Sequence, residues 1–155
     1  MKNVNSEKDN SFSDFEKGAM KERAKELKQA KNKEANEQAV LDKIEELIPD
    51  DRIIVSSIFA LVKHSFPALG CRTWYGMPAW TKDDKVLFFF QGSEKFGSRY
   101  CTLGFSDLAK LDDGALWPTS YAITEWNEIL AQEVKSLIAK AIGSAKLIES
   151  SVGRD

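Results

Sequence analysis

The sequence predicts an α+β fold, in which a helical hairpin and a C-terminal helix pack against an antiparallel sheet of about four or five strands. Apolar residues repeat with helical spacing before residue 67 and again after residue 124. Between them, short segments rich in β-branched and aromatic residues alternate with turn sequences. The length of 155 residues corresponds to one domain, and 43% hydrophobic with 30% charged residues is ordinary for a globular chain that buries a substantial core.

The N-terminal part of the chain is polar and charged. Residues 1–11 are predicted to be disordered, and residues 12–34 to form a basic amphipathic helix that starts at a capping box beginning with Ser13. This segment holds seven basic residues with interleaved glutamates, a pattern typical of a solvated helix with i,i+4 ion pairs. A basic arm for nucleic acid or for an acidic partner is the alternative interpretation. A polar joint at Asn32–Asn36 is expected to end this helix.

Two further helices are expected before the sheet. The apolar face from Val40 to Ile48 predicts one helix, which Pro49 ends. Asp50 or Asp51 is predicted to cap the next, and the apolar residues of Ile53–Phe66 crowd more than one face, which indicates a central, largely buried helix. Because the connection is short, the two helices are expected to form a hairpin.

Four segments read as strands: Arg72–Tyr75, Val86–Gln91, Ser98–Phe105 and Thr119–Thr124. The second lacks apolar–polar alternation, which favours an inner strand covered on both faces. Asp83-Asp84 and Gly92–Gly97 are expected to be short hairpin connections.

The last predicted helix begins at Thr124 as its N-cap and closes at Gly143. The α+β domain is thus expected to span residues 37–143, followed by a flexible tail, 144–155.

Composition and charge argue against several kinds of function. The N-terminus lacks the apolar core of a signal peptide, and no apolar run is long enough to span a bilayer. Two cysteines 30 positions apart form neither a disulfide framework nor a zinc pattern, so a cytoplasmic location and no membrane partner are expected. The net charge of −2 provides no general attraction for nucleic acid, which is therefore not expected as a partner. With His64 as the only histidine, an enzyme is not expected.

Carboxylates occur in four adjacent pairs: Glu45-Glu46, Asp50-Asp51, Asp83-Asp84 and Asp112-Asp113. Caps, turns and solvent-facing helix positions explain them, and no cofactor is expected. Hard oxygen ligands of this kind can also hold iron weakly at a surface, which is the alternative.

The segment from Cys71 to Gln91 dominates the second half of the chain. It packs two tryptophans, a tyrosine and three consecutive phenylalanines around a Gly-Met-Pro turn, and 12 of the 16 aromatic residues lie between Trp74 and Trp126. An apolar ligand-binding cleft is predicted at this turn, because aromatic rings dominate burial energetics while a turn backbone needs polar surroundings. The predicted binding residues are Arg72, Trp74, Tyr75, Met77, Pro78, Trp80, Phe90, Gln91, Lys95, Tyr100 and Trp117.

The run Thr73–Ala79 resembles the Y-G-M-P signature of the YdhG-like bacterial domains of unknown function, and Lys85–Phe90 resembles the strand that follows it in that family. Leu111–Ser120 is similar to the C-terminal motif of a subgroup that also carries an N-terminal helix. The resemblance implies a compact α+β domain. Some members of the family are described as frataxin-like iron chaperones, so it also implies iron carriage through surface carboxylates as the alternative to a non-catalytic binding domain.

Overall fold

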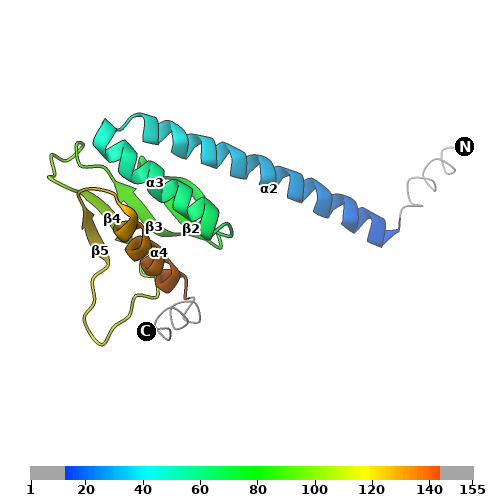
Figure 1. The fold of residues 1–155 in the computed structure, drawn as a ribbon. Coiled ribbons are helices and arrows are strands. Elements are labelled where there is room, and N and C mark those ends of the chain that lie inside the picture. The colour runs from blue at the N-terminus through cyan, green and yellow to red at the C-terminus, as the bar shows by residue number, and fades with distance from the viewer. Residues whose placement is uncertain (1–12, 144–155) are drawn as a thin grey trace, which may run out of the picture. The chain divides into compact units, whose positions relative to one another are not determined.

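The computed structural model describes residues 13–143 and has the α+β fold that the sequence predicts (Figure 1). The elements, in chain order, are α2 (Asp14–Glu45), α3 (Pro49–Ser65), β1 (Gly70–Trp74), β2 (Met77–Lys82), β3 (Lys85–Gln91), β4 (Cys101–Phe105), β5 (Ser120–Ile123) and α4 (Glu128–Ile142). The predicted disordered N-terminus, residues 1–11, and the predicted flexible tail, residues 144–155, lie outside the described residues. Within residues 13–143, no helix has both the length and the apolar character needed to cross a membrane.

The chain divides into two units, Met1–Ala35 and Asn36–Asp155. The predicted helix end at Asn32–Asn36 is wrong, because α2 continues through these residues without a break. None of the five is Gly or Pro, and polarity alone does not interrupt a helix. The predicted cap is confirmed at the start of α2, where the Ser13 hydroxyl accepts a hydrogen bond of 3.1 Å from the backbone N–H of Glu16.

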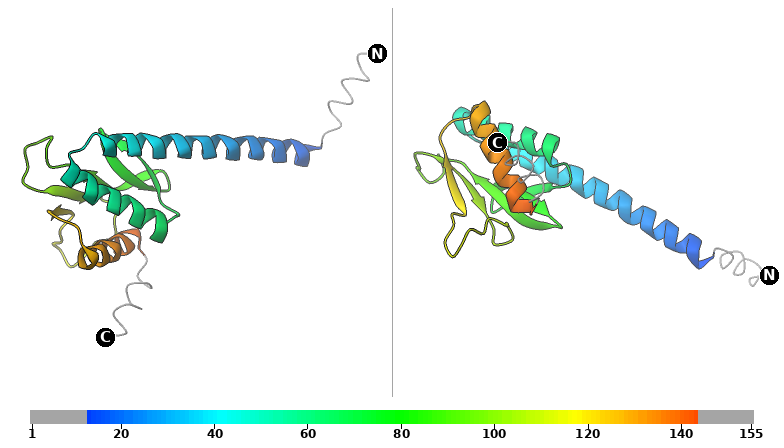
Figure 2. Two further views of the ribbon diagram at one scale, coloured as in Figure 1. Left: turned by 45° about the horizontal axis from the view of Figure 1, so that its top comes forward. Right: turned by 60° about the horizontal axis from the view of Figure 1, so that its bottom comes forward.

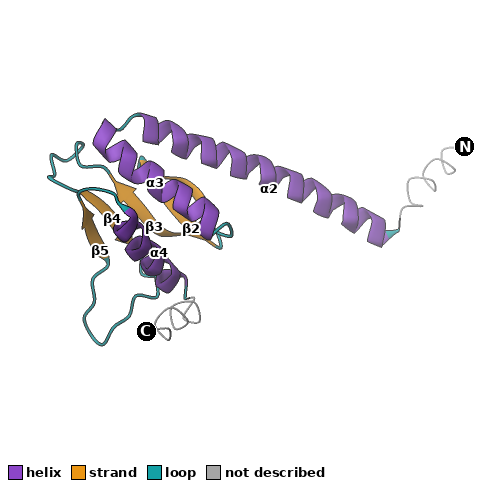
Figure 3. Ribbon diagram, viewed as in Figure 1, coloured by secondary structure: helices purple, strands orange, loops and turns teal. Residues whose placement is uncertain are grey.

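In the unit Asn36–Asp155, α3 and α4 lie on one face of the sheet (Figures 1 and 2). Figure 3 shows this helical layer over the strands. The core lies between the two layers, where the side chains of Val55, Ile58, Phe88, Leu103 and Ile138 are all 0% exposed. Burial of each such side chain contributes about 1.5–3 kcal/mol, which makes this interface the main source of stability.

The C-terminal part of α2 and α3 form the predicted hairpin. Lys63 of α3 donates a hydrogen bond to the Glu37 carboxylate of α2, 26 residues earlier in the chain. Val40 and Ile44 of α2 join the same buried cluster as Ile54 of α3.

The sheet is an antiparallel meander with strand order β1-β2-β3-β4-β5. Its first two turns are as short as hairpin turns can be. Tyr75-Gly76 joins β1 to β2, and Asp83-Asp84 joins β2 to β3, as predicted for the latter. All four residues have positive φ, between 50° and 77°, as type I′ turns require. The sequence prediction missed β2, because Gly76 and Pro78 read as a single longer turn.

The predicted caps of the last two helices need correction. Neither Asp50 nor Asp51 is the N-cap of α3: that position belongs to Ile48, whose side chain makes no capping hydrogen bond, with Pro49 following. Thr124 is not the N-cap of α4.

Asn127 is the N-cap of α4, and its Oδ1 accepts a hydrogen bond of 2.8 Å from the backbone N–H of Leu130. Gly143 closes α4 with a φ of 97°, as predicted. Lys82 Nζ donates a hydrogen bond of 2.8 Å to the carbonyl oxygen of Ile142, which places a cation at the negative end of the helix.

Replacing Phe88 by Ala should lower the free energy of unfolding by about 3–5 kcal/mol, because it empties the centre of the core and removes a ring stacked on Trp80 at 4.9 Å. The matched control, Phe96→Ala, removes a ring that is 62% exposed and should change stability by less than about 0.5 kcal/mol. Urea denaturation measures both, and equal losses would contradict this account of the core.

Candidate functional site

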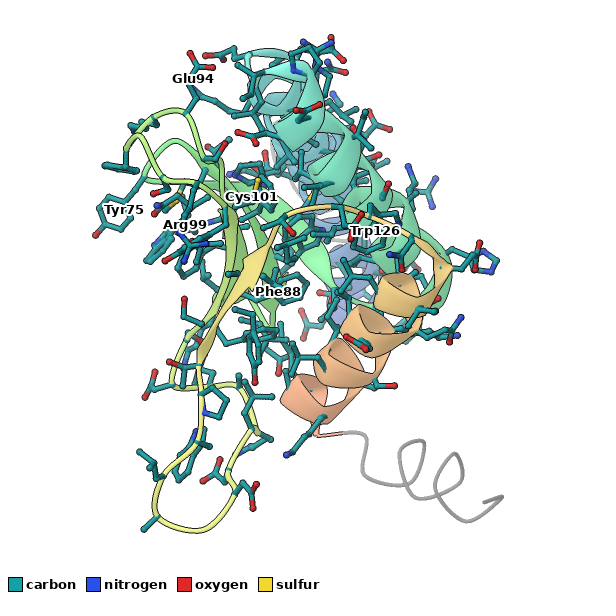
Figure 4. All side chains as sticks on the ribbon, turned by 60° about the vertical axis from the view of Figure 1, so that its left-hand side comes forward. Tyr75, Phe88, Glu94, Arg99, Cys101 and Trp126 are labelled. Carbon is teal, nitrogen blue, oxygen red and sulfur yellow. The ribbon has the colours of Figure 1, made fainter. Side chains whose placement is uncertain are left out.

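The pairing register decides which strand residues face α3 and α4. Directly opposed residues lie on the same side of a sheet, and successive residues alternate. Phe88 pairs with Trp80 and with Phe105, and all three are buried; Figure 4 shows Phe88 between the sheet and the helices. Phe89 therefore points to the opposite side, which we call the outer face. The strand residues of the outer face include Arg72, Trp74, Met77, Ala79, Phe89, Gln91, Thr102, Gly104, Ser120 and Ala122.

Three aromatic rings are in contact along the outer face. The ring centroids of Tyr75 and Trp74 are 4.7 Å apart in an edge-to-face arrangement, and those of Trp74 and Phe89 are 5.1 Å apart. We call Tyr75, Trp74 and Phe89 the ring row. It crosses β2 at Ala79, which is 0% exposed and whose small side chain leaves room for rings from the flanking strands to meet. Such contacts contribute about 0.5–1.5 kcal/mol each beyond burial.

Gly104 extends the surface onto β4. It pairs with Phe89, and a Cβ atom at position 104 would lie 2.3 Å from Cζ of the Phe89 ring. The Phe89 ring thus occupies the space that any side chain at position 104 would need. The absence of a side chain on β4 is what allows the ring to lie across it.

Tyr75 is held in an unfavourable backbone conformation. Its φ is 50°, in the left-handed region that bulky residues rarely adopt, and its side chain is 79% exposed. Such a conformation costs on the order of 1 kcal/mol relative to the Asn or Gly usual at this turn position. The turn therefore presents a large ring to solvent at a cost in stability, which is a feature typical of functional positions.

Polar and cationic groups border the ring row. Arg72 is exposed and pairs with Ala79, beside the rings. Gln91 and Thr102 pair with each other on the same face. The Arg99 guanidinium lies 5.5 Å from the centroid of the Tyr100 ring, and Figure 4 shows Arg99 and Tyr75 on the side of the sheet away from the helices.

A buried carboxylate anchors the Gly92–Gly97 loop, which leads to Arg99. Asp51 of α3 is 3% exposed and accepts hydrogen bonds from the backbone N–H of Ser93 at 2.8 Å, from the Ser93 hydroxyl at 2.8 Å, and from the Cys101 thiol at 3.1 Å. None of these three donors is charged. A Cβ at Gly92 would lie 3.0 Å from Asp51 Oδ2, so the loop approaches the carboxylate as closely as its backbone permits.

The pKa values of Asp51 and Cys101 shift in opposite directions. Burial raises the pKa of Asp51, but the hydrogen bonds from Cys101 and Ser93, together with backbone N–H groups, outweigh it and hold the pKa below 3.8. Burial, together with the neighbouring Asp51 carboxylate, raises the pKa of the Cys101 thiol to about 12. At neutral pH the pair is therefore a carboxylate that accepts a hydrogen bond from a neutral thiol.

The structure brings five of the predicted binding residues, Arg72, Trp74, Tyr75, Met77 and Gln91, to the outer face or its turn.

Three predicted binding residues do not lie on the outer face: Pro78, Trp80 and Phe90 are buried, the last two at 1% and 0% exposure. The physical reason is the pleat, which turns these positions toward α3 and α4 while their neighbours Ala79 and Phe89 point outward.

The other three predicted residues lie in connections between strands. Lys95 is exposed in the Gly92–Gly97 loop, with its amino group 5.6 Å from the centroid of the Phe96 ring. Tyr100 is half-buried beneath Arg99, and Trp117 is half-buried against the core cluster.

Sequence reasoning missed Phe89, Arg99 and the two small residues, Ala79 and Gly104, that let the rings pack. For Phe89 a signal was available: three consecutive phenylalanines in one strand cannot all point inward. For Ala79 and Gly104 no local signal exists, because their role depends on rings from neighbouring strands.

Two hollows lie elsewhere, against α4. One, of about 280 Å³, is lined by residues that include Thr124, Ile129 and Glu133. The other, of about 470 Å³, runs along α4 past Ser136 and Leu137. Neither contains a predicted binding residue. Within residues 13–143, no three His, Cys, Asp or Glu side chains come together as a metal-binding group.

Comparison of the chain with protein-family models, with curated proteins and with solved structures gave no match.

Gly104→Ala should lower the free energy of unfolding by about 1–3 kcal/mol, because the new methyl group forces the Phe89 ring off β4. The same substitution in a Phe89→Ala background should cost clearly less, since the ring it displaces is gone. A double-mutant cycle measured by urea denaturation gives the coupling between the two sites. Additive effects would contradict the packing of Phe89 on Gly104.

Asp51→Asn should lower the free energy of unfolding at pH 7 by about 1–3 kcal/mol, because it disrupts a buried hydrogen-bonded carboxylate. Since the folded-state pKa is lowered, the stabilisation by Asp51 is fully present above pH 3.8 and is lost as the pH falls through the folded-state value. The difference in free energy of unfolding between wild type and variant should therefore be constant around neutral pH and become smaller below about pH 4. Asp50→Asn, an exposed neighbour in the same helical turn, is the matched control and should change stability by less than about 0.5 kcal/mol. A gap that widens on acidification would contradict the assignment.

Proposed function

We propose that the chain is a non-catalytic binding domain whose recognition surface is the outer face of the sheet, centred on the ring row. The observation that carries this proposal is Tyr75: a tyrosine with a φ of 50° and a side chain that is 79% exposed, in ring contact with Trp74. A chain selected for stability alone would place Asn or Gly at this position, so the exposed ring is best explained by contact with a ligand.

The composition of the outer face supports recognition. Trp, Tyr and Arg are the residues that dominate binding energies in protein interfaces, because each combines a large apolar surface with a polar group. Here Trp74, Tyr75 and Arg72 lie within one turn and the strand that leads into it. The underlying sheet is rigid, since every strand pairs with its neighbours and its other face is packed on α3 and α4. The rings are therefore held in place before a ligand arrives, which reduces the entropy lost on binding.

The pKa shifts of Cys101 and Asp51 favour a structural role for both groups and support a non-catalytic function. The rise in the pKa of Cys101 to about 12 keeps it a neutral thiol at physiological pH, which is unfavourable for a nucleophile. The pKa of Asp51 is lowered, which is unfavourable for a general base. Burial, the hydrogen bond between Asp51 and Cys101, and the bonds from Ser93 that hold the Gly92–Gly97 loop account for both pKa shifts without a catalytic role.

The resemblance to YdhG-like domains, the cytoplasmic location and weak iron binding through carboxylate pairs stay predictions. The proposed surface depends on none of them, because it contains no carboxylate at any strand position.

The proposal can be tested by NMR with the full-length, ¹⁵N-labelled chain and a library of small aromatic and anionic compounds. Compounds that bind should shift the amide signals of Arg72–Met77 and Phe89–Gln91. Tyr75→Asn should weaken those shifts about fivefold or more while keeping the fold, because Asn suits a left-handed turn position. Phe96→Ala, which removes an exposed ring outside the ring row, is the control and should leave them unchanged. Shifts confined to the hollows along α4, or insensitive to Tyr75→Asn, would overturn the proposal.

A further inference from the structure

We propose that the outer face binds single-stranded nucleic acid, with bases stacked on the ring row and phosphates contacted by Arg72 and Arg99. This inference rests on the proposed function and gives that surface a ligand class.

The shape of the surface favours an extended ligand with flat groups. The ring row runs from Tyr75 through Trp74 to Phe89, and the centroids of neighbouring rings are 4.7 Å and 5.1 Å apart. On β4 it meets Gly104, where no side chain rises beside Phe89. A small molecule on an open sheet face keeps much of its surface in water, whereas a strand of successive bases can cover several rings at once. Base–aromatic stacking is the interaction by which single-strand-binding surfaces gain affinity without reading sequence.

The distribution of charge favours an anion. None of the five strands contains Asp or Glu, and the charged strand residue of the outer face is Arg72. The carboxylates of the domain lie in helices and connections instead. The net charge of −2 led to the expectation that nucleic acid is not a partner, but net charge averages over the whole surface. A phosphate at the outer face meets Arg72 on β1 and Arg99 in the connection just before β4, both exposed. Their guanidinium groups suit bidentate contact with phosphate.

Hydrogen-bonding groups complete the surface. Gln91 and Thr102 face each other across β3 and β4, next along the strand from Phe89 and Gly104. The amide of Gln91 and the hydroxyl of Thr102 can each donate and accept hydrogen bonds. Beside a base stacked on Phe89, they can bond to the edge of that base or to a sugar hydroxyl. Each class of group in a nucleotide thus has a counterpart on the outer face.

The test is fluorescence anisotropy of the full-length chain with labelled ten-nucleotide oligo(dT) and oligo(rU) at about 50 mM salt. The wild type should bind with a salt dependence that corresponds to about two phosphate contacts, a slope near −1.4 in log K against log salt. Tyr75→Asn should weaken binding about fivefold and Trp74→Ala about tenfold or more. Arg72→Gln should weaken it less but reduce the salt slope by about 0.7.

Two matched controls keep the result specific. Phe96→Ala removes an exposed ring outside the ring row, and Lys110→Gln removes an exposed cation whose backbone bonds to the end of α4. Neither should change binding by more than about twofold. The triple variant Lys21→Gln, Lys25→Gln, Lys28→Gln tests the basic segment of α2. It should still bind the oligonucleotides, and Tyr75→Asn and Trp74→Ala should still weaken that binding.

The inference is overturned if neither oligonucleotide binds at millimolar concentration, or if binding survives Tyr75→Asn and Trp74→Ala but is lost in the triple lysine variant. It is also overturned if free nucleotides, or poly-glutamate as an acidic peptide, compete as well as the oligonucleotides at equal concentration of charge. If oligonucleotides fail while other compounds still shift the amides of Arg72–Met77, the proposed binding surface stands and only its ligand class is wrong.

Discussion

The pleat of the central strand β3 determines the rest of this structure. Its three consecutive phenylalanines cannot share one side, so Phe88 and Phe90 enter the core while Phe89 is turned outward. The inward pair holds the sheet against α3 and α4. The outward residue leaves an aromatic side chain on a face that those helices do not cover, and the ring row forms around it.

The fold class could be predicted because its signals are local and redundant. Helical periodicity, short aromatic strands and acidic turns agree with each other, although α2 was predicted as two helices and is one. The strand β2 was missed because Gly76 and Pro78 both indicate a turn. In the structure the turn is only Tyr75-Gly76, and Pro78 is tolerated inside β2 because pairing with β3 begins one residue later, at Ala79.

Part of the candidate site could be predicted, because aromatic density is a local feature of the sequence. A list based on aromatic density named Trp74, Tyr75 and Arg72, which lie at the outer face or its turn, but also Trp80 and Phe90, which are buried, since density carries no information on direction. Direction in a strand has a period of two, so it needs the exact strand boundaries, and these were the weakest part of the prediction. Once β2 is known to begin at Met77, alternation places Trp80 and Ala79 on opposite faces of the sheet, and the core cluster identifies the face of Trp80 as the inner one.

Asp51 shows the limit of reading neighbouring residues as a pair. In sequence, Asp50 and Asp51 look equivalent, and both suit the start of a helix. In the fold, Asp50 is exposed, whereas Asp51 is directed at Ser93 and Cys101, which lie 42 and 50 residues further along the chain. The distinction arises only when α3 is packed on the sheet, so no local pattern could reveal it. The same packing fixes the loop that leads to Arg99, which connects the buried carboxylate on one side of the sheet to the cationic border of the ring row on the other.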